Sequence, residues 1–183
     1  MKIIAVDEKK DLFCVENIIP SNLIEQIANL DVTSYNWELQ QGQENWKRRK
    51  LIPPNHSPLH LIDKHLNEIR PYIADSIGVT FNEYDCWSSF WYDSEGFTTN
   101  IHLDGALPNA MQIYLTNCDE NLGTVFYYDT SVPWKVRYKF PYKANTGYLM
   151  LNNANQWHAV PTVLKSGQAR LSSYTYFGSY NHK

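Results

Sequence analysis

The chain is short of cysteine and carries no large excess of charge. It holds three cysteines in 183 residues, an odd number without Cys-x-x-Cys spacing, so neither a disulfide framework nor a cysteine zinc site is expected. The formal net charge of −3 gives no general attraction to nucleic acid or to an anionic membrane. No apolar run approaches the roughly 20 residues that span a bilayer. These absences argue against a membrane protein and against nucleic acid as a partner.

The first residues also lack the pattern of a secretion signal. The apolar stretch Met1 to Val6 is followed by four charged residues and is too short for the core of such a signal. Unpaired cysteines fit a reducing compartment, and we expect Cys14, Cys86 and Cys118 to be free and mostly buried. The sequence therefore predicts a cytoplasmic protein.

Aromatic residues, by contrast, are abundant. They make up 14% of the chain, while hydrophobic residues reach 43% and charged residues only 19%. Aromatic and β-branched side chains suit the half-buried surface of a sheet, so a β-rich fold is favoured. The length fits a single domain over 1–183, with 1–83 as a helical and extended N-terminal buttress and 84–177 as the core.

Two segments of the N-terminal part have helical periodicity. The first begins at Ser21-Asn22 with Glu25 in a capping arrangement. The second begins at Ser57-Pro58, ends at Gly78 and should be kinked or broken at Pro71. The polar, Trp-bearing segment 37–49 between them is predicted to be a loop or an edge strand.

After Gly78 the hydrophobic period changes from that of a helix to that of a strand. Short aromatic and β-branched runs follow one another, separated by turn-forming residues. These runs are 84–92, 97–103, 111–116, 124–128, 136–140, 148–152, 158–163 and 170–177. Strands at this spacing predict a β-rich α+β fold: a double-stranded β-helix (jelly roll, cupin-like) barrel with the N-terminal helices packed outside.

Four features of this predicted barrel carry chemistry. In His102-Leu103-Asp104 the imidazole and the carboxylate share one face if the segment is a strand. His158 opens a later strand, and two histidines with one carboxylate form the facial set of ligands that holds Fe(II). Arg170 has a planar fork suited to a carboxylate, and Ser172 lies on the same face of its strand.

These features resemble the Fe(II)/2-oxoglutarate-dependent oxygenases, especially the prolyl-4-hydroxylase-like members, over residues 84–177. The resemblance rests on Tyr92 and Gly96 before His102-x-Asp104, then Ile113-Tyr114-Leu115, Gly123-Thr124-Val125-Phe126, Asn145-x-Gly147, His158 and Arg170-x-Ser172. It implies that His102, Asp104 and His158 ligate iron. It also implies that Arg170, assisted by Ser172, binds the distal carboxylate of 2-oxoglutarate, and that Tyr92 and Thr124 contact this cosubstrate.

The activity implied by the resemblance is oxidation of a substrate C–H bond, most simply hydroxylation. Fe(II), 2-oxoglutarate and O2 would be required, with ascorbate as an optional reductant, and succinate and CO2 would be released. The substrate would be a peptide side chain or a small metabolite, and the oligomeric state stays open. Two alternatives remain: a cupin-like metalloenzyme without 2-oxoglutarate, and a non-catalytic jelly-roll binding module. The presence of both Arg170 and Ser172 favours the oxygenase.

The remaining polar and aromatic features have simpler interpretations. His60 and His65 are five residues apart and do not form a helical metal pair. The basic run 47–50 is expected to be a solvated face, with contact to an anionic substrate or carrier as the alternative. Tyr114 is expected to pack in the core. Most tryptophans should do the same, with one or two at the substrate mouth.

Overall fold

A computed structural model describes residues 1–32, 38–39, 48–52, 58–84, 86–104, 109–128, 133–151 and 155–183, with residues 38, 39 and 52 as backbone only. The helices are α1 (Ser21–Ala28) and α2 (Leu59–Ile77), with a 3-10 turn at Glu120–Leu122. The strands are β1 (Lys2–Ala5), β2 (Leu12–Glu16), β3 (Glu38–Leu39), β4 (Arg49–Ile52), β5 (Val79–Phe81), β6 (Trp87–Asp93), β7 (Asn109–Tyr114), β8 (Val125–Tyr127), β9 (Val136–Lys139), β10 (Thr146–Leu151), β11 (His158–Ala159), β12 (Arg170–Tyr176) and β13 (Tyr180–His182).

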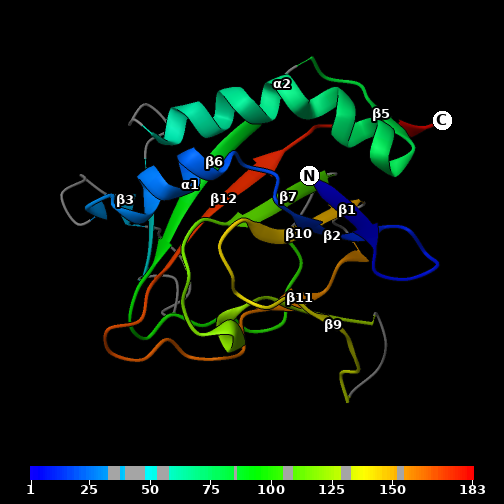
Figure 1. Cartoon of the computed structure of the whole chain (residues 1–183). Coiled ribbons are helices and arrows are strands. Elements are labelled where there is room, and N and C mark those ends of the chain that lie inside the picture. The colour runs from blue at the N-terminus through cyan, green and yellow to red at the C-terminus, as the bar shows by residue number, and fades with distance from the viewer. Residues whose placement is uncertain are drawn as a thin grey trace.

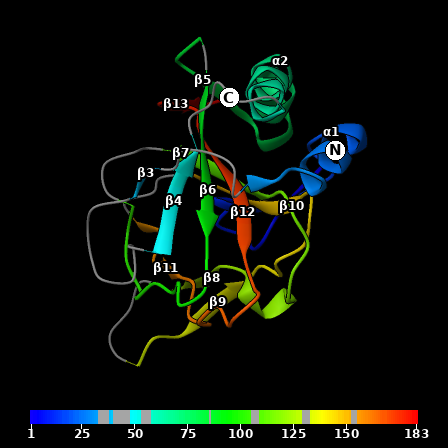
Figure 2. The same cartoon turned by 90° about the vertical axis from the view of Figure 1, so that its left-hand side faces the viewer.

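Two sheets face one another (Figures 1 and 2). The larger has eight strands in the order β1-β2-β10-β7-β12-β6-β4-β3, and the smaller has three in the order β11-β8-β9. A short pair, β13-β5, lies at the C-terminal end of α2. The prediction of a β-rich fold with a few helices is confirmed.

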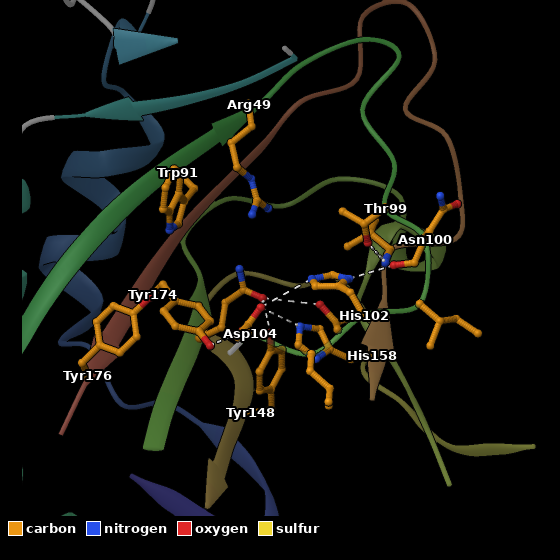
Figure 3. A pocket seen from close by; sticks show the side chains of 15 residues that line it. Arg49, Trp91, Thr99, Asn100, His102, Asp104, Tyr148, His158, Tyr174 and Tyr176 are labelled. Atoms are coloured by element: carbon orange, nitrogen blue, oxygen red, sulfur yellow. Dashed lines mark hydrogen bonds and ion pairs between the residues drawn. The ribbon is translucent and has the colours of Figure 1, made fainter. Parts of the chain in front are cut away.

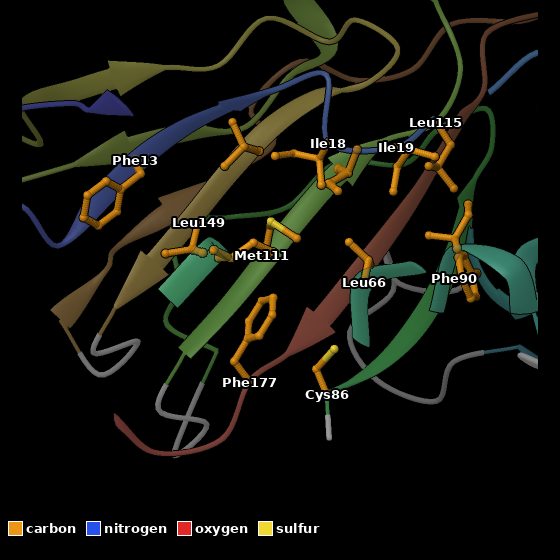
Figure 4. Packing of buried hydrophobic residues seen from close by; sticks show 14 of the residues in the cluster. Phe13, Ile18, Ile19, Leu66, Cys86, Phe90, Met111, Leu115, Leu149 and Phe177 are labelled. Atoms are coloured by element: carbon orange, nitrogen blue, oxygen red, sulfur yellow. The ribbon is translucent and has the colours of Figure 1, made fainter. Parts of the chain in front are cut away.

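Alternate residues of the large sheet enter two different cores. On β7, Met111 and Ile113 point toward α1 and α2, whereas Ala110 and Tyr114 point toward the small sheet. The helix-side core is mainly aliphatic, and its packing is shown in Figure 4. This two-sided burial follows from the period of two along a strand when both faces of the sheet are covered.

The helix boundaries show how far local patterns reach. α2 ends at Gly78, which adopts a left-handed φ of +72°, so the predicted stop is confirmed. The helix continues through Pro71 without a break. The predicted cap at Ser21 was wrong: α1 already includes Ser21, and the extended Pro20 precedes it, its carbonyl accepting from the amides of Leu23 and Ile24. Ser57 lies outside the described residues. Neither helix combines the length and hydropathy needed to cross a bilayer.

Three strand expectations need correction. Residues 97–103 form a loop with one isolated bridge at His102, because the chain leaves the large sheet after β6 to reach the small one. The run 158–163 is a strand only over β11. The N-terminal part is more than a buttress, since β1 to β4 all belong to the large sheet, with β2 paired to β10 and β4 to β6. The three cysteines are free, as expected, although only Cys86 is fully buried.

Candidate active site

A cavity of about 380 Å3 lies between the two sheets. Figure 3 shows that side chains from strands far apart in the sequence converge on its centre. Among the residues expected to act, His102, Asp104, His158 and Thr124 line this cavity. Tyr92, Arg170 and Ser172 do not line it.

His102, Asp104 and His158 form a compact cluster whose potential ligand atoms all lie within 4.8 Å of one another. The Asp104 Oδ1 is 3.4 Å from the Nε2 of His102 and 3.5 Å from the Nε2 of His158. The backbone brings the histidines together: each amide donates to the other's carbonyl at 3.0 Å across the bridge between the 97–104 loop and β11. Two reciprocal backbone hydrogen bonds therefore build the cluster from segments distant in the chain.

The orientation of both imidazoles is set by the residue two positions earlier. His102 Nδ1 lies 2.7 Å from the carbonyl oxygen of Asn100, and His158 Nδ1 lies 2.8 Å from that of Gln156. A carbonyl only accepts, so each Nδ1 carries a proton, and each Nε2 is directed toward Asp104. The Phe126 ring stacks on His158 with centroids 5.2 Å apart. Both rings are thus oriented for metal binding.

Asp104 is held in the ionised form. Burial alone would raise the pKa of this carboxyl, but the charge of His158 and hydrogen bonds from both imidazoles and from Tyr174 hold it well below its usual range. The Tyr174 hydroxyl, from β12, donates to Asp104 Oδ2, so the carboxylate is oriented with Oδ1 toward the histidines. Burial tends to lower the pKa of His158, and the neighbouring Asp104 raises it above its ordinary value.

A chain of buried polar groups extends from this cluster along the large sheet. The Tyr148 hydroxyl donates to Gln112 Oε1 at 2.7 Å, and the Gln112 amide nitrogen donates to the Ser172 hydroxyl at 3.0 Å. Thr124 closes the chain: it accepts from the Tyr114 hydroxyl at 3.0 Å, and its own hydroxyl reaches Gln112 Oε1 at 3.4 Å. Tyr114 is buried as expected, but its hydroxyl joins this network.

Arg170 lies one layer behind the cavity wall. It is fully buried, and none of Nε, Nη1 and Nη2 has a hydrogen-bond partner. Its guanidinium carbon lies 5.3–5.9 Å from the ring centroids of Phe97, Tyr114 and Tyr142. The Asp93 carboxylate balances its charge at 3.7 Å. A buried guanidinium without hydrogen bonds is costly, and its donors suit a carboxylate ligand.

The placement expected for Tyr92 was wrong by one residue. Tyr92 packs against the helix-side core, and its neighbour Trp91 lines the cavity. Neighbouring residues of a strand point to opposite faces, so a shift of one position moves a side chain from the site to the core.

Tyr174 and Arg49 are two of the cavity-lining residues that sequence reasoning missed. The Tyr174 that bonds Asp104 follows Arg170 and Ser172 at the same two-residue spacing, so strand alternation could have found it. Arg49 belongs to the basic run expected to be solvated, yet its side chain is only 14% exposed and lines the cavity. No local pattern distinguishes Arg49 from Arg48, which is exposed. Lys47 lies outside the described residues.

Fold and site together define a two-sheet β-protein whose central cavity presents two imidazoles and one carboxylate to a common point. Solved structures with a similar fold include prolyl hydroxylases and an oxidoreductase of the 2OG-Fe(II) oxygenase family. A prolyl-4-hydroxylase of Pseudomonas putida matches with a TM-score of 0.61 and 16% identity, covering 95% of this chain and 96% of that one. A Trichoplax adhaerens prolyl hydroxylase, in complex with a hypoxia inducible factor peptide fragment, gives a TM-score of 0.65 at 15% identity, covering 96% and 87%.

A third similar structure is HygX from Streptomyces hygroscopicus, with nickel and 2-oxoglutarate bound. It matches with a TM-score of 0.60 and 14% identity, covering 92% of this chain and 83% of that one. No family model matches the chain, and no curated protein matches it in sequence. Likeness at these identities shows the fold alone, so function has to be argued from the site.

Proposed function

We propose that the protein is an Fe(II)- and 2-oxoglutarate-dependent oxygenase that hydroxylates a C–H bond of a peptide side chain or small metabolite, releasing succinate and CO2. The observation that carries the proposal is the cluster of His102, Asp104 and His158, whose ligand atoms converge within 4.8 Å on the wall of a cavity. Two histidines and one carboxylate on one side of a metal leave the opposite positions open, as iron oxygenases require.

The residues around the cluster suit a resident metal. Carbonyl acceptors fix the tautomer of both histidines, and Tyr174 orients the carboxylate. Such outer hydrogen bonds set the direction and basicity of the ligands. His102, Asp104 and His158 would therefore hold Fe(II).

The chain also offers the groups that a dicarboxylate cosubstrate needs. The three nitrogens of Arg170 have no hydrogen-bond partner, although the side chain is fully buried. The hydroxyl of Ser172, two residues along β12 from Arg170, and that of the cavity-lining Thr124 both bond the side chain of Gln112. We propose that Arg170 holds the distal carboxylate of 2-oxoglutarate, with Ser172 and Thr124 as polar neighbours.

When bound, iron with 2-oxoglutarate and O2 supplies the oxidation of the C–H bond. The protein orients and shields this reaction. Asp104 stays ionised because its neighbours hold its pKa low. Val160 and Trp91 line the cavity wall, and so does Tyr176, whose ring centroid lies 4.2 Å from that of Trp87.

The similar structures support this proposal through what they contain. One holds nickel and 2-oxoglutarate, and another is bound to a peptide fragment. A peptide or small-molecule substrate is consistent with them, and the net charge of −3 offers nucleic acid no general attraction. Ascorbate would act as an optional reductant.

The test is an anaerobic titration of the protein with Fe(II) and then 2-oxoglutarate, followed by the weak visible charge-transfer band. We expect the band in the wild type and its loss in His102→Ala. His65→Ala is a matched control, because His65 bonds the Ile18 carbonyl at 3.0 Å outside the cavity. Metal binding without the band would favour a cupin-like enzyme without 2-oxoglutarate. No metal binding would leave a non-catalytic binding module.

A further inference from the structure

Two arginines from different parts of the chain meet at one buried carboxylate. Asp93 of β6 is paired in register with Arg49 of β4 on one side and with Arg170 of β12 on the other. Arg49 binds it in bidentate fashion, with Nε 2.6 Å from Oδ1 and Nη2 3.0 Å from Oδ2. Arg170 Nη1 lies 3.7 Å from Oδ2. Among the described residues, one carboxylate thus faces two guanidinium groups.

Only Arg49 of this pair lines the cavity. Figure 3 shows its side chain extending from β4 toward the cluster. The guanidinium carbon lies 5.2 Å from the Trp91 ring centroid and 4.5 Å from that of Phe97, the ring that also neighbours Arg170. The aromatic rings and Asp93 hold the charged group in place, so it is preorganised for an anion.

We infer that Arg49 is a second anchor for the distal carboxylate of 2-oxoglutarate, acting beside Arg170. The inference rests on the proposed function, and it adds a cosubstrate contact from outside the expected core 84–177.

Charge balance favours the distal carboxylate of 2-oxoglutarate, rather than a carboxylate of the substrate, as the ligand of Arg49. A divalent metal on Asp104 would leave one positive charge for the chelating carboxylate of 2-oxoglutarate. Asp93 with its two arginines leaves one for the distal carboxylate. The bound dianion would neutralise both, and the described cavity lining holds no further arginine or lysine for a third carboxylate.

The experiment compares two ligands that share a chelating head. 2-Oxopentanoate has the same chain length as 2-oxoglutarate but ends in a methyl group. Each is titrated into anaerobic Fe(II)-loaded wild type, Arg49→Met and Arg170→Met, and the charge-transfer band gives the dissociation constant. We expect Arg49→Met to weaken 2-oxoglutarate binding by about 10- to 100-fold, the value of a charge-assisted hydrogen bond, and 2-oxopentanoate binding by less than about twofold.

Two further variants separate contact from structural damage. Arg49→Lys keeps the charge beside Asp93, and we expect it to lose less affinity for 2-oxoglutarate than Arg49→Met. Arg70→Met removes an arginine that lies 5.3 Å from the Phe81 ring on the helix side, and it should change neither ligand. If Arg49→Met does not fold, the two-ligand comparison is made on Arg49→Lys.

Three results would overturn the inference. Unchanged 2-oxoglutarate affinity in Arg49→Met would leave Arg170 as the anchor of the distal carboxylate. Arg49 would then bind the substrate or stabilise the fold. Equal losses for both ligands would show general damage. Loss of 2-oxoglutarate affinity in Arg70→Met would show that replacing an arginine packed on an aromatic ring lowers the affinity even outside the cavity. A wild type without any band is a different result, because it removes the proposed function itself.

Discussion

The central strands β7, β10 and β12 of the large sheet are buried on both faces, but the two faces differ in chemistry. On β10, Leu149 and Leu151 pack against the helix-side core, while Tyr148 and Met150 face the small sheet. On β7, Gln112 lies buried on the cavity side between helix-facing Met111 and Ile113. The helix side stabilises the fold by burying apolar side chains. On the cavity side, hydrogen-bonded polar side chains occupy part of the buried space.

This difference shows how a small fold carries a reactive cavity. Buried polar side chains cost free energy unless they are paired, and most of those on the cavity side are paired with one another. Arg170 is the exception that points to a ligand. The helix-side core supplies the stability that lets the other face bear an unsatisfied guanidinium.

The largest expected effect is on the cavity side. Replacing His158 with alanine should weaken metal binding by more than about 100-fold, because changes one shell further out already cost 10- to 100-fold. Calorimetric titration with Fe(II) or Ni(II) under anaerobic conditions measures it. His65→Ala should bind the metal with wild-type affinity. Unchanged metal affinity in His158→Ala would mean that the cluster is not the metal site.

A helix-side substitution should lower stability and leave metal affinity unchanged. Leu149 is fully buried, and Leu149→Ala should lower the free energy of unfolding by about 2–5 kcal/mol through lost burial and a residual cavity. Urea unfolding measures the loss. Metal affinity of the folded variant should stay at the wild-type value, and a parallel loss of both would show that the two faces are coupled.

Tyr148→Phe tests the cavity-side network at a residue adjacent to Leu149. It removes the hydroxyl that donates to Gln112 at 2.7 Å, so we expect a stability loss of about 1 kcal/mol. The same urea measurement applies. A stability loss as large as that of Leu149→Ala would contradict the view that the helix side contributes most of the stability.

The smallest effect is expected outside both cores. Hydrogen bonds and the charge of Arg137 outweigh burial and lower the pKa of Asp7 in the folded state. The stability from this shift is present above the unfolded pKa and is lost as pH falls through the lower folded one. Arg137→Met should therefore flatten the stability profile below about pH 4. Urea midpoints across that range report it, and an unchanged slope would show that the pair contributes nothing.

Local sequence patterns predicted the parts of the fold that depend on local geometry. Gly78 ends α2 because only a glycine-like residue adopts its left-handed φ readily. Strand alternation predicts Arg170 and Ser172 on one face, and they contact Tyr114 and Gln112 on the cavity side of the sheet. The place of β1 to β4 in the large sheet depends on pairing between distant segments, which no local period encodes.

The site shows the same limit. His102, Asp104 and His158 were predicted as a group, and the structure brings them together. Arg49 could not be found, because its burial depends on pairing with Asp93 across strands. Tyr92 was misplaced since a single-residue shift of register exchanges the faces of a strand.

The backbone bridge between His102 and His158 has a consequence for the chain as a polymer. A metal held by both would close a long loop with a coordinate cross-link, as a disulfide does with a covalent bond. The three cysteines are free and form no disulfide cross-link. The metal cross-link would be opened by a chelator. Without the metal, the 97–104 loop would stay joined to β11 and Val160 by the backbone hydrogen bonds of His102 and Thr99.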